Sequence, residues 1–452
     1  MIVMKFGGSS VANAERIRHV AEIVKGCLNR RPVLVLSAMG DTTDHLLEAA
    51  ENALETGMVK TDKIAELHIN TIKELGLGDS SLSEIRLLLE ELNNLLMGIS
   101  LLRELTGRIK DYLVSFGERL SVRIAAAHFN AIGIKALAVD AWDAGFISDS
   151  NYTSAELTEE CWAVIPEKIS SPEKEGILQI VTGFIGKNKN GNITTLGRGG
   201  SDLTATMIAA ACGAEEAQIW KDVDGILTAD PRIVKEARVV EAISYEAASE
   251  LAFYGSQVLH PRAMQPCIKT ATPVLVKNSY NPQAPGTRII SSASFVSARD
   301  IKKCSIQTVT THKNITVVDI VSSRMLGQHG FLAEVFACFA KHRVSVDMVA
   351  TSEVSISLTL EAYHDLTALK NDLSRIASIE IKTGKAIVTI IGDVNRSSEI
   401  LSRSFRTCEL LGVQVQMISQ GASKVNISFI VDNSEADDVV KGLHRDFFEP
   451  RS

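Results

Sequence analysis

Short β-rich runs alternate with longer helical runs up to about residue 290, and this alternation is the feature that most limits the possible folds. It is typical of an α/β layer fold, because parallel strands need long, usually helical, connections. The expected strands are Ile2–Phe6, Pro32–Leu36, Ile134–Val139, Ile177–Val181, Ile193–Leu196, Ala217–Trp220 and Val274–Lys277. The stretch from Glu51 to Thr106 has apolar residues at helical spacing and predicts an inserted helical subdomain.

The turn-rich segment Asn281–Thr287 predicts a domain boundary shortly after it. After this boundary the sequence contains an internal repeat at an offset of 69 residues. Each copy predicts a helix, an alternating strand (Val344–Val349 and Val413–Ile418), a polar turn and a second strand (Val354–Leu360 and Lys424–Val431). Two ββαβ-type units that bury their faces against each other are expected. A chain of 452 residues is long enough for two to four domains.

The composition of the chain argues against several classes of function. With 45% hydrophobic and 22% charged residues, the chain is expected to be globular. Its net charge of -7 and the lack of a dense Lys/Arg stripe argue against nucleic acid as a partner. No apolar run reaches membrane-spanning length and no leader is evident, so a cytoplasmic protein is expected, although a mature organellar protein would look the same. The scattered cysteines and histidines show no metal-ligand spacing, so no structural metal is expected.

The first candidate binding loop, Lys5–Ser10, follows a strand and precedes a helical pattern that begins near Ala12. Gly7 and Gly8 let backbone N–H groups approach a phosphate closely, and Lys5 adds a full positive charge. The loop matches neither the G-x-x-x-x-G-K-[ST] nor the G-x-G-x-x-G fingerprint. By itself it fits a plain tight turn equally well.

A second loop, Thr195–Asp202, lies between a strand and a helix expected over Leu203–Ala211. It combines three glycines, an arginine and a carboxylate, a set that is costly to keep for packing alone. Arg198 suits a substrate carboxylate. Asp202 either caps the following helix or orients lysines and magnesium around a transferring phosphate, and we favour the second role.

Two further segments carry charged groups. Trp220–Arg232 is acidic and turn-rich, yet its Lys221 and Arg232 could meet nucleotide phosphates and its Asp222 the base or ribose. Glu118, in a polar stretch expected at the head of a helix, could favour the helix dipole or hold a substrate ammonium. Together the loops indicate phosphoryl transfer, which depends mainly on positioning and charge stabilisation. A carboxylate acceptor, with a pKa of about 4, is ionised at neutral pH and needs no general base.

The motifs Lys5–Val11, Ser115–Glu118, Thr195–Asp202 and Val258–Pro261 resemble those of the aspartate kinase family, and the likeness spans essentially the whole chain. It is closest to the monofunctional plant-type and lysine-sensitive bacterial members. The resemblance implies an amino-acid-kinase fold, a three-layer αβα arrangement with a largely parallel central sheet, followed by tandem ferredoxin-like ACT domains. His260, within the last motif, is interpreted as a structural residue before a turn.

The resemblance also implies a domain division. The catalytic domain would cover residues 1–290, a linker 291–302, the first ACT domain 303–384 and the second ACT domain 385–452. In this family the first ACT unit is inserted into the second. The segment Cys304–His312 could therefore be a strand of the later unit.

By motif match, the resemblance assigns residues to ATP and to aspartate. The catalytic residues would be Lys5 and Asp202, with Asp202 organising the lysine. The residues that would contact aspartate are Thr43, Glu118, Arg198, Gly199, Gly200 and Ser201. The residues that would contact ATP are Lys5, Phe6, Gly7, Gly8, Lys221, Asp222, Leu227, Arg232, Gln257 and Val258. Lysine-sensitive members often have a lysine where this chain has Gln257, which leaves one nucleotide contact open. Mg²⁺ would be held mainly by the phosphates of ATP, with no metal site on the protein.

The same likeness implies an effector pocket at an ACT dimer interface. Its residues would be Met325, Gly330, Phe331, Leu332, Ser345, Asp347, Thr351, Ser352 and Glu353. A buried acid such as Asp347 among valines is unusual without a cationic partner, which a lysine ammonium would supply. The alternative is an aspartate that ends the strand at solvent. Lysine is the expected inhibitor and S-adenosylmethionine a second candidate, and a homodimer or dimer of dimers through the ACT domains is expected.

The resemblance thus predicts an aspartate kinase that makes 4-phospho-L-aspartate and ADP, the first step toward lysine, threonine and methionine. The expected compartment is the cytoplasm, with the plastid stroma as the alternative for a mature protein. Two other functions stay open: a related amino-acid kinase for another acceptor, such as glutamate or N-acetylglutamate, and a non-catalytic amino-acid sensor. The intact Lys5, Arg198 and Asp202 argue against the sensor.

Overall fold

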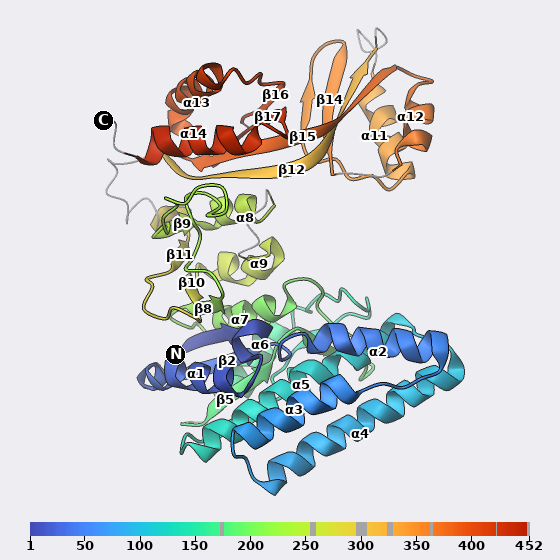
Figure 1. Cartoon of the computed structure of the whole chain (residues 1–452), viewed down its shortest axis with the longest axis vertical. Helices are drawn as coiled ribbons and strands as arrows, with labels where there is room; N and C mark the ends of the chain where they lie inside the picture. Colours follow the sequence, from blue (N-terminus) through green and yellow to red (C-terminus); the bar gives the residue numbers. More distant parts are fainter. Residues whose placement is uncertain are drawn as a thin grey trace. The chain divides into compact units, whose positions relative to one another are not determined.

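The chain forms two compact units, which Figure 1 colours from blue to red along the sequence. The computed structural model describes residues 1–171, 176–253, 259–294, 305–322, 329–361, 365–421 and 423–449. The first unit comprises Met1–Ile226, Glu241–Tyr245 and Val258–Ser297, and the second comprises Leu227–Val240, Glu246–Gln257 and Ala298–Ser452. This division differs from the one expected from sequence, because two segments from within residues 1–290 fold with the second unit.

An eight-stranded sheet forms the centre of the first unit. Its order is β3-β5-β2-β1-β8-β10-β11-β9, and neighbouring strands run parallel except for β10 and β11. The strands are β1 (Ile2–Phe6), β2 (Pro32–Leu36), β3 (Ala136–Val139), β5 (Leu178–Thr182), β8 (Ala217–Lys221), β9 (Ala242–Ser244), β10 (Val274–Asn278) and β11 (Thr287–Ile290). The predicted strand at Ile193–Leu196 joins a separate three-stranded sheet instead. That sheet contains β4 (Ile147–Ser148), β6 (Ile185–Asn188) and β7 (Ile193–Thr195).

Helices cover both faces of the large sheet, which confirms the predicted α/β fold class. They are α1 (Ala14–Lys25), α2 (Thr42–Thr56), α3 (Asp62–Glu74), α4 (Asp79–Leu102), α5 (Gly107–Ala131), α6 (Cys161–Ile169), α7 (Gly200–Ala211) and α9 (Pro261–Thr270). Ile2, Met4 and Phe6 of β1 belong to the core that α1, α2 and α5 also share. The alternate residues of β1 face α7, since side chains alternate along a strand. The predicted helical stretch is present as α2 to α4, which Figure 1 shows as long helices beside α5.

The second unit is built on one antiparallel sheet of six strands, in the order β13-β14-β12-β15-β17-β16. The strands are β12 (Ile306–Val321), β13 (Val349–Thr351), β14 (Ser355–Leu360), β15 (Ser378–Gly392), β16 (Met417–Ser419) and β17 (Asn426–Asp432). Residues 306–313 of β12 pair with the part of β15 that also pairs with β17, whereas residues 316–321 also pair with β14. The start of β12 thus belongs with the later repeat, the arrangement that the resemblance implied. Cys304 lies outside the described residues.

Two hydrophobic cores hold the helices of the second unit on this sheet. These helices are α11 (Phe331–Lys341), α12 (Thr367–Leu373), α13 (Ser397–Leu411) and α14 (Ala436–Phe448). The unit also contains residues 246–253 of α8 (Tyr245–Phe253). One core joins α11 and α12 to β12 and β14 through residues such as Phe331 and Leu373. The other joins α13 and α14 to β15 and β17 through residues such as Ile400 and Leu443. Each core corresponds to one copy of the sequence repeat.

The alternating runs predicted as strands at Val344–Val349 and Val413–Ile418 are wrong over most of their length. Only their last residues enter β13 and β16. Val344 packs partly buried against the core of α11 and α12, and Val413 packs likewise against the core of α13 and α14. The alternation therefore reflects side chains that are buried from a connecting segment, whose backbone pairs with β14 or β17 only toward its end.

Residues 227–240, predicted as part of the catalytic domain, pack into the core of the second unit. Ala229 and Val234 are buried together with residues of β12, β15, β17 and α14. Thr228 Oγ1 lies 3.0 Å from Nε2 of the fully buried His444 on α14. These contacts are made by the small apolar residues of the segment. The sequence analysis considered only its turn-forming and charged residues and therefore did not predict these contacts.

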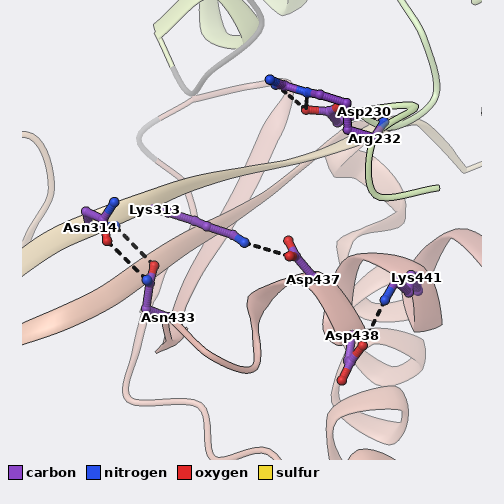
Figure 2. A network of polar contacts seen from close by, with 8 residues as sticks. All are labelled: Asp230, Arg232, Lys313, Asn314, Asn433, Asp437, Asp438 and Lys441. Atoms are coloured by element: carbon purple, nitrogen blue, oxygen red, sulfur yellow. Dashed lines mark hydrogen bonds and ion pairs between the residues drawn. The ribbon is translucent and has the colours of Figure 1, made fainter.

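Figure 2 shows the polar contacts around this segment, all within the second unit. Arg232 pairs with Asp230 at 2.6 Å, and its side chain is 88% exposed. Lys313 of β12 pairs with Asp437 of α14 at 2.7 Å. The charge of Lys313 also helps to lower the pKa of Asp230, after the larger effect of the hydrogen bond from Arg232. Arg232, predicted to contact nucleotide, therefore belongs to the second unit.

Helix α5 packs unusually close to the loop that follows β2. A Cβ atom added at Gly117, in the middle of α5, would lie 2.6 Å from Cβ of Ala38. A contact of that length does not occur between real side chains, so the helix can take this position only because residue 117 is glycine. The approach brings the next residue, Glu118, against the same loop.

We predict opposite effects for alanine at two glycines inside helices. Gly98→Ala in α4 meets no atom within 4 Å and should stabilise the protein by about 0.5–1 kcal/mol through helix propensity. Gly117→Ala gains the same propensity but forces α5 away from Ala38, so a net loss of about 1–2 kcal/mol is expected. Urea unfolding of the two variants beside the wild type measures the difference. Equal effects of the two substitutions would show that the close approach is unimportant.

Candidate active site

Two lysines and one aspartate form a buried cluster at the ends of β1 and β8. Lys5 pairs in register with Ile219, so Lys5 and Lys221 both project to the face covered by α7. Asp202 lies in the first turn of α7 and meets both of them. Its Oδ1 is 2.7 Å from Nζ of Lys5, and its Oδ2 is 3.6 Å from Nζ of Lys221. The sequence named all three residues, and the structure brings them together.

The charges of this cluster depend on each other. Burial alone would raise the pKa of Asp202, but the charges of Lys5 and Lys221 hold it below its usual value. Burial lowers the pKa of Lys221, although Asp202 opposes that change. With two cations against one carboxylate, the cluster keeps one unneutralised positive charge in a largely buried place. Such a place favours the binding of an anion.

The helix-cap interpretation of Asp202 is wrong. The residue that caps α7 is Gly199, whose φ of 75° lies in the left-handed region that glycine adopts at little cost. Asp202 lies inside the helix, with its carboxylate turned to the lysines. The predicted helix at Leu203 also starts earlier than expected, since α7 begins at Gly200. The carboxylate is thus free to hold the lysines in place.

Glu118 occupies the interior of α5, which contradicts the expectation that it sits at the head of a helix. Gly117 does not end the helix; it lies within α5 and packs against the loop after β2. The N–H of Ala38 donates to Oε1 of Glu118 at 3.2 Å, while Oε2 is buried without a partner in the described part of the chain. Burial raises the pKa of Glu118 to about 8, against the lowering effects of the Ala38 N–H and of the charge on Lys5. A cation brought to Oε2 would satisfy this carboxylate.

A pocket of about 500 Å³ lies between the lysine cluster and Glu118. The predicted residues that line it are Lys5, Gly8, Thr43, Glu118, Arg198, Gly199, Gly200, Ser201 and Asp202. The hydroxyl of Ser37, which the sequence did not single out, also lines it and donates to Oγ of Ser201 at 3.0 Å. Its lining combines the cations of Lys5 and Arg198 with the carboxylates of Glu118 and Asp202. It can therefore receive a ligand that carries both signs of charge.

Other predicted residues lie elsewhere. Phe6 is fully buried and stacks on Trp220, with ring centroids 5.6 Å apart, so only its backbone faces the glycine loop. Asp222 is exposed beyond the end of β8. Leu227, like Arg232, belongs to the second unit. Gln257 and Val258 are outside the described residues.

Three residues that the sequence analysis missed hold the site in shape. Asp111 of α5 accepts hydrogen bonds from the N–H and the hydroxyl of Thr195, at 3.0 and 2.8 Å, directly before the glycine loop. Arg262 donates to the carbonyl of Leu196 at 3.0 Å. The N–H of Ser279 donates to the carbonyl of Lys221 at 2.7 Å. Isolated polar residues of this kind carry no local signal, because their partners are distant in sequence.

His260 has a structural role, in keeping with its interpretation from sequence. It caps α9, and its Nδ1 accepts from the N–H of Arg262 at 3.2 Å. A Cβ atom on Gly199 would lie 2.7 Å from Cβ of His260, so the start of α9 packs directly against the glycine loop. His260 does not line the pocket.

The predicted effector residues lie in the second unit around α11 and β13. Gly330 caps α11, Phe331 is buried in its core and Leu332 is 43% exposed. Asp347 is half-buried; burial and the charge of Glu361 raise its pKa to about 6. The remaining predicted residues in this region, Ser345, Thr351, Ser352 and Glu353, are all exposed. Met325 lies outside the described residues. Among the described residues, only the charge of His312 opposes this upward shift of the Asp347 pKa.

Comparison with known proteins agrees with this architecture. The amino acid kinase family matches residues 1–278, and an ACT domain family matches residues 318–370 and 388–447. Aspartokinase 1 of Arabidopsis thaliana, a chloroplastic protein, is 48% identical over 464 residues, which cover 99% of this chain and 80% of the relative. The chain belongs to the aspartokinase family.

Other relatives of this aspartokinase include a bacterial enzyme of known structure. The lysine-sensitive aspartokinase 3 of Escherichia coli is 33% identical, with 99% of each chain covered. The crystal structure of E. coli aspartokinase III with lysine and aspartate matches with a TM-score of 0.82 at 33% identity, covering 99% of this chain and all of that one. An aspartate kinase of Clostridium acetobutylicum matches with a TM-score of 0.85 at 27% identity, over 99% of this chain and 100% of that chain. The predicted order of a kinase fold followed by ACT domains is confirmed.

Two classes of feature are missing from the part of the chain that the structure describes. No helix there combines the length and the apolar composition that crossing a bilayer requires. No group of three or more His, Cys, Asp or Glu side chains there is placed to hold a metal ion.

We predict that Glu118→Gln stabilises the protein increasingly as pH rises. A folded pKa of about 8 means that the unfolded chain releases the Glu118 proton first, so the wild type loses stability between about pH 4.5 and 8. Glutamine can keep the hydrogen bond from Ala38 but has no proton to lose. The stability gap between variant and wild type should grow by on the order of 3 kcal/mol across that range.

Urea unfolding at pH 5 and pH 8 measures this gap. The exposed Glu55→Gln variant serves as the control, and its stability should run parallel to that of the wild type. If Glu118→Gln also runs parallel, the carboxyl group is ionised in the folded protein and its surroundings differ from those described.

Proposed function

We propose that this aspartokinase transfers the γ-phosphoryl group of ATP to the side-chain carboxylate of L-aspartate, giving 4-phospho-L-aspartate and ADP. The observation that carries the proposal is the pocket lined by Lys5, Asp202, Arg198 and Glu118, with Lys221 pairing with the same Asp202. Aspartate has one ammonium and two carboxylates, and this pocket offers a counterpart for each. The product would enter the routes to lysine, threonine and methionine.

In this proposal the phosphates of ATP lie on the backbone of Gly7 and Gly8 and on the two lysines. Lys5 and Lys221 stabilise the negative charge of the transferring phosphoryl group, which is the main catalytic requirement of such a transfer. Asp202 stays ionised, as its lowered pKa indicates, and orients both ammonium groups. Its carboxylate is not needed as a base, because the attacking carboxylate of aspartate is already ionised at neutral pH.

The other end of the pocket would hold the amino-acid part of aspartate. Arg198 suits the α-carboxylate as a bidentate donor, and the hydroxyls of Thr43 and Ser201 can donate to carboxylate oxygens. Glu118 would accept from the ammonium through its buried, unpartnered Oε2. Because a bound ammonium favours the ionised carboxylate, binding of aspartate would lower the pKa of Glu118 from about 8.

Magnesium is proposed to arrive with the nucleotide. Asp202 is the only acidic residue near the phosphate end of the described pocket lining, and both of its oxygens already face lysines. A dedicated protein cage for Mg²⁺ is thus not supported, which agrees with the usual reliance of this ion on substrate phosphates and water.

We predict that Lys5→Ala lowers kcat by at least about 100-fold, because one charge on the transferring group is lost. The KM for aspartate should change much less, since Arg198 and Glu118 are unaltered. ADP release with aspartate measures turnover, and parallel assays with glutamate and N-acetylglutamate identify the acceptor. The matched control is Lys25→Ala, which removes an exposed lysine of α1 and should leave kcat unchanged. Near-normal turnover of Lys5→Ala would remove the phosphate role of this residue.

We further propose that lysine binds to the second unit near Asp347 and inhibits the enzyme. The relative from E. coli is named lysine-sensitive, and the matching E. coli structure contains lysine and aspartate. In this chain the half-buried carboxylate of Asp347 faces the like charge of Glu361, so a ligand ammonium would relieve that repulsion. A pair of chains joined through these domains, as a homodimer or a dimer of dimers, would form the pocket.

We predict that lysine raises the melting temperature of the wild type and that Asp347→Asn abolishes the rise. A ligand that binds only the native state stabilises it by an amount that grows with its concentration. Thermal unfolding with lysine, threonine or S-adenosylmethionine compares the candidate effectors in one assay. Glu334→Gln, which removes an exposed acid of α11, is the control and should respond like the wild type. A shift with threonine but not with lysine would contradict the assignment.

The compartment is proposed from the relatives and is either the plastid stroma or the cytoplasm. The three Arabidopsis relatives are named chloroplastic, whereas the bacterial enzyme has no such compartment.

A further inference from the structure

A second cavity of about 500 Å³ lies in the first unit, on the side of α5 that the candidate active site does not use. Its charged and aromatic lining residues are Glu91, Arg108, Tyr112, Arg119, Trp142 and Lys187. They come from α4, α5, the loop behind β3 and strand β6, and the turn between β6 and β7 completes the lining. A volume of about 300–1,000 Å³ is typical of small-molecule sites.

Arg119 is the most buried cation of this cavity. Its side chain is only 11% exposed, and its Nη2 lies 3.1 Å from Oε2 of Glu91. The other oxygen of Glu91 accepts from the hydroxyl of Tyr112. In the described part of the chain, Nε and Nη1 of Arg119 are buried and have no hydrogen-bond partner. Buried donors without partners are costly, so a ligand that accepts from them would be stabilising.

Two more cations face this cavity without an acidic partner. Nζ of Lys187 lies 4.3 Å from the ring centroid of Trp142, and neither Lys187 nor Arg108 forms an ion pair with an acidic residue among the described residues. Glu91 is therefore the one acid against three cations in the lining. A ligand of negative charge would balance this excess.

We propose that this cavity binds a small organic or inorganic polyanion, one that carries two or more carboxylate or phosphate groups. Arg119 and Lys187 supply charge-assisted hydrogen bonds, and Arg108, which is exposed, supplies a third cation at the same cavity. The site is separate from the proposed catalytic pocket and does not depend on its chemistry, since the two cavities share no lining residue.

The same elements connect this cavity to the proposed aspartate site. Arg119 directly follows Glu118 on α5, and successive residues of a helix point about 100° apart. Ile193 of β7 lines the cavity, and Thr195 of the same strand is held by Asp111 of α5 just before the glycine loop. A ligand that draws α5 and β7 together would therefore change the position of Glu118. We infer that occupancy of the cavity alters the affinity for aspartate.

Thermal unfolding of the full chain with citrate or pyrophosphate, without nucleotide or Mg²⁺, tests the binding. KCl at matched ionic strength corrects for general salt effects. We expect a saturable rise in melting temperature beyond that in KCl, from citrate if the ligand class is carboxylate and from pyrophosphate if it is phosphate. No saturable rise with either probe would overturn the proposal.

Variants assign the rise to this cavity. Arg108→Ala/Lys187→Ala should weaken the apparent affinity at least about tenfold. Arg108→Ala alone removes an exposed side chain and should weaken the affinity in part. Lys110→Ala removes an exposed cation of α5 outside the lining and should bind like the wild type. Lys5→Ala should also keep the rise, because it alters only the proposed phosphate site. Equal binding by the double variant, or loss of the rise in Lys5→Ala, would place the anion elsewhere.

Calorimetric titration of aspartate with and without saturating citrate or pyrophosphate tests the connection. A change of at least about threefold in the dissociation constant, absent in Arg108→Ala/Lys187→Ala, is expected. An unchanged constant would overturn the link through α5. If the double variant instead alters the oligomeric state, measured by light scattering, the cavity is a contact between chains and the small-molecule proposal is wrong. The kinase activity of the wild type and of the double variant is also measured without added anion. Turnover of aspartate in this assay supports the proposed kinase function, whatever the outcome of the anion experiments.

Discussion

The arrangement of the candidate site depends on one buried carboxylate that faces two lysines. Asp202 lies between Lys5 and Lys221, and removing this carboxylate would leave two like charges close together inside the protein. The lysines come from two parallel strands whose ends meet at one edge of the sheet, and the aspartate comes from the first turn of the helix that covers them. The parallel sheet is thus what makes this charge arrangement possible. Antiparallel neighbours would have placed the second lysine at the opposite edge.

Helix α5 determines the other half of the site. Along one helix, Asp111 holds the strand before the glycine loop, Gly117 allows contact with the loop after β2, and Glu118 reaches into the pocket. Arg119 faces the second cavity. A buried helix of this length is stiff, so a change at one of these residues is felt at the others.

Much of the fold and part of the site could be predicted from the sequence. Local patterns located the strands that carry Lys5 and Lys221, because short apolar runs that end in glycine or charge are distinctive. They misplaced Glu118, because a glycine inside a helix resembles a helix end when its packing partner is unknown. They also missed Asp111, since a lone buried acid on a helix has no sequence signal until its distant partner is known. Contacts between segments far apart in sequence account for all of these failures.

The segment 227–240 is the case with the largest functional consequence. The segment begins only a few residues after Lys221. Its Ala229 and Val234 are nevertheless buried in a core of the second unit. Lys221 and this core are therefore joined by a short covalent connection that ends at Leu227. A shift of β12 or α14 would be passed along this connection, because Thr228 contacts both elements.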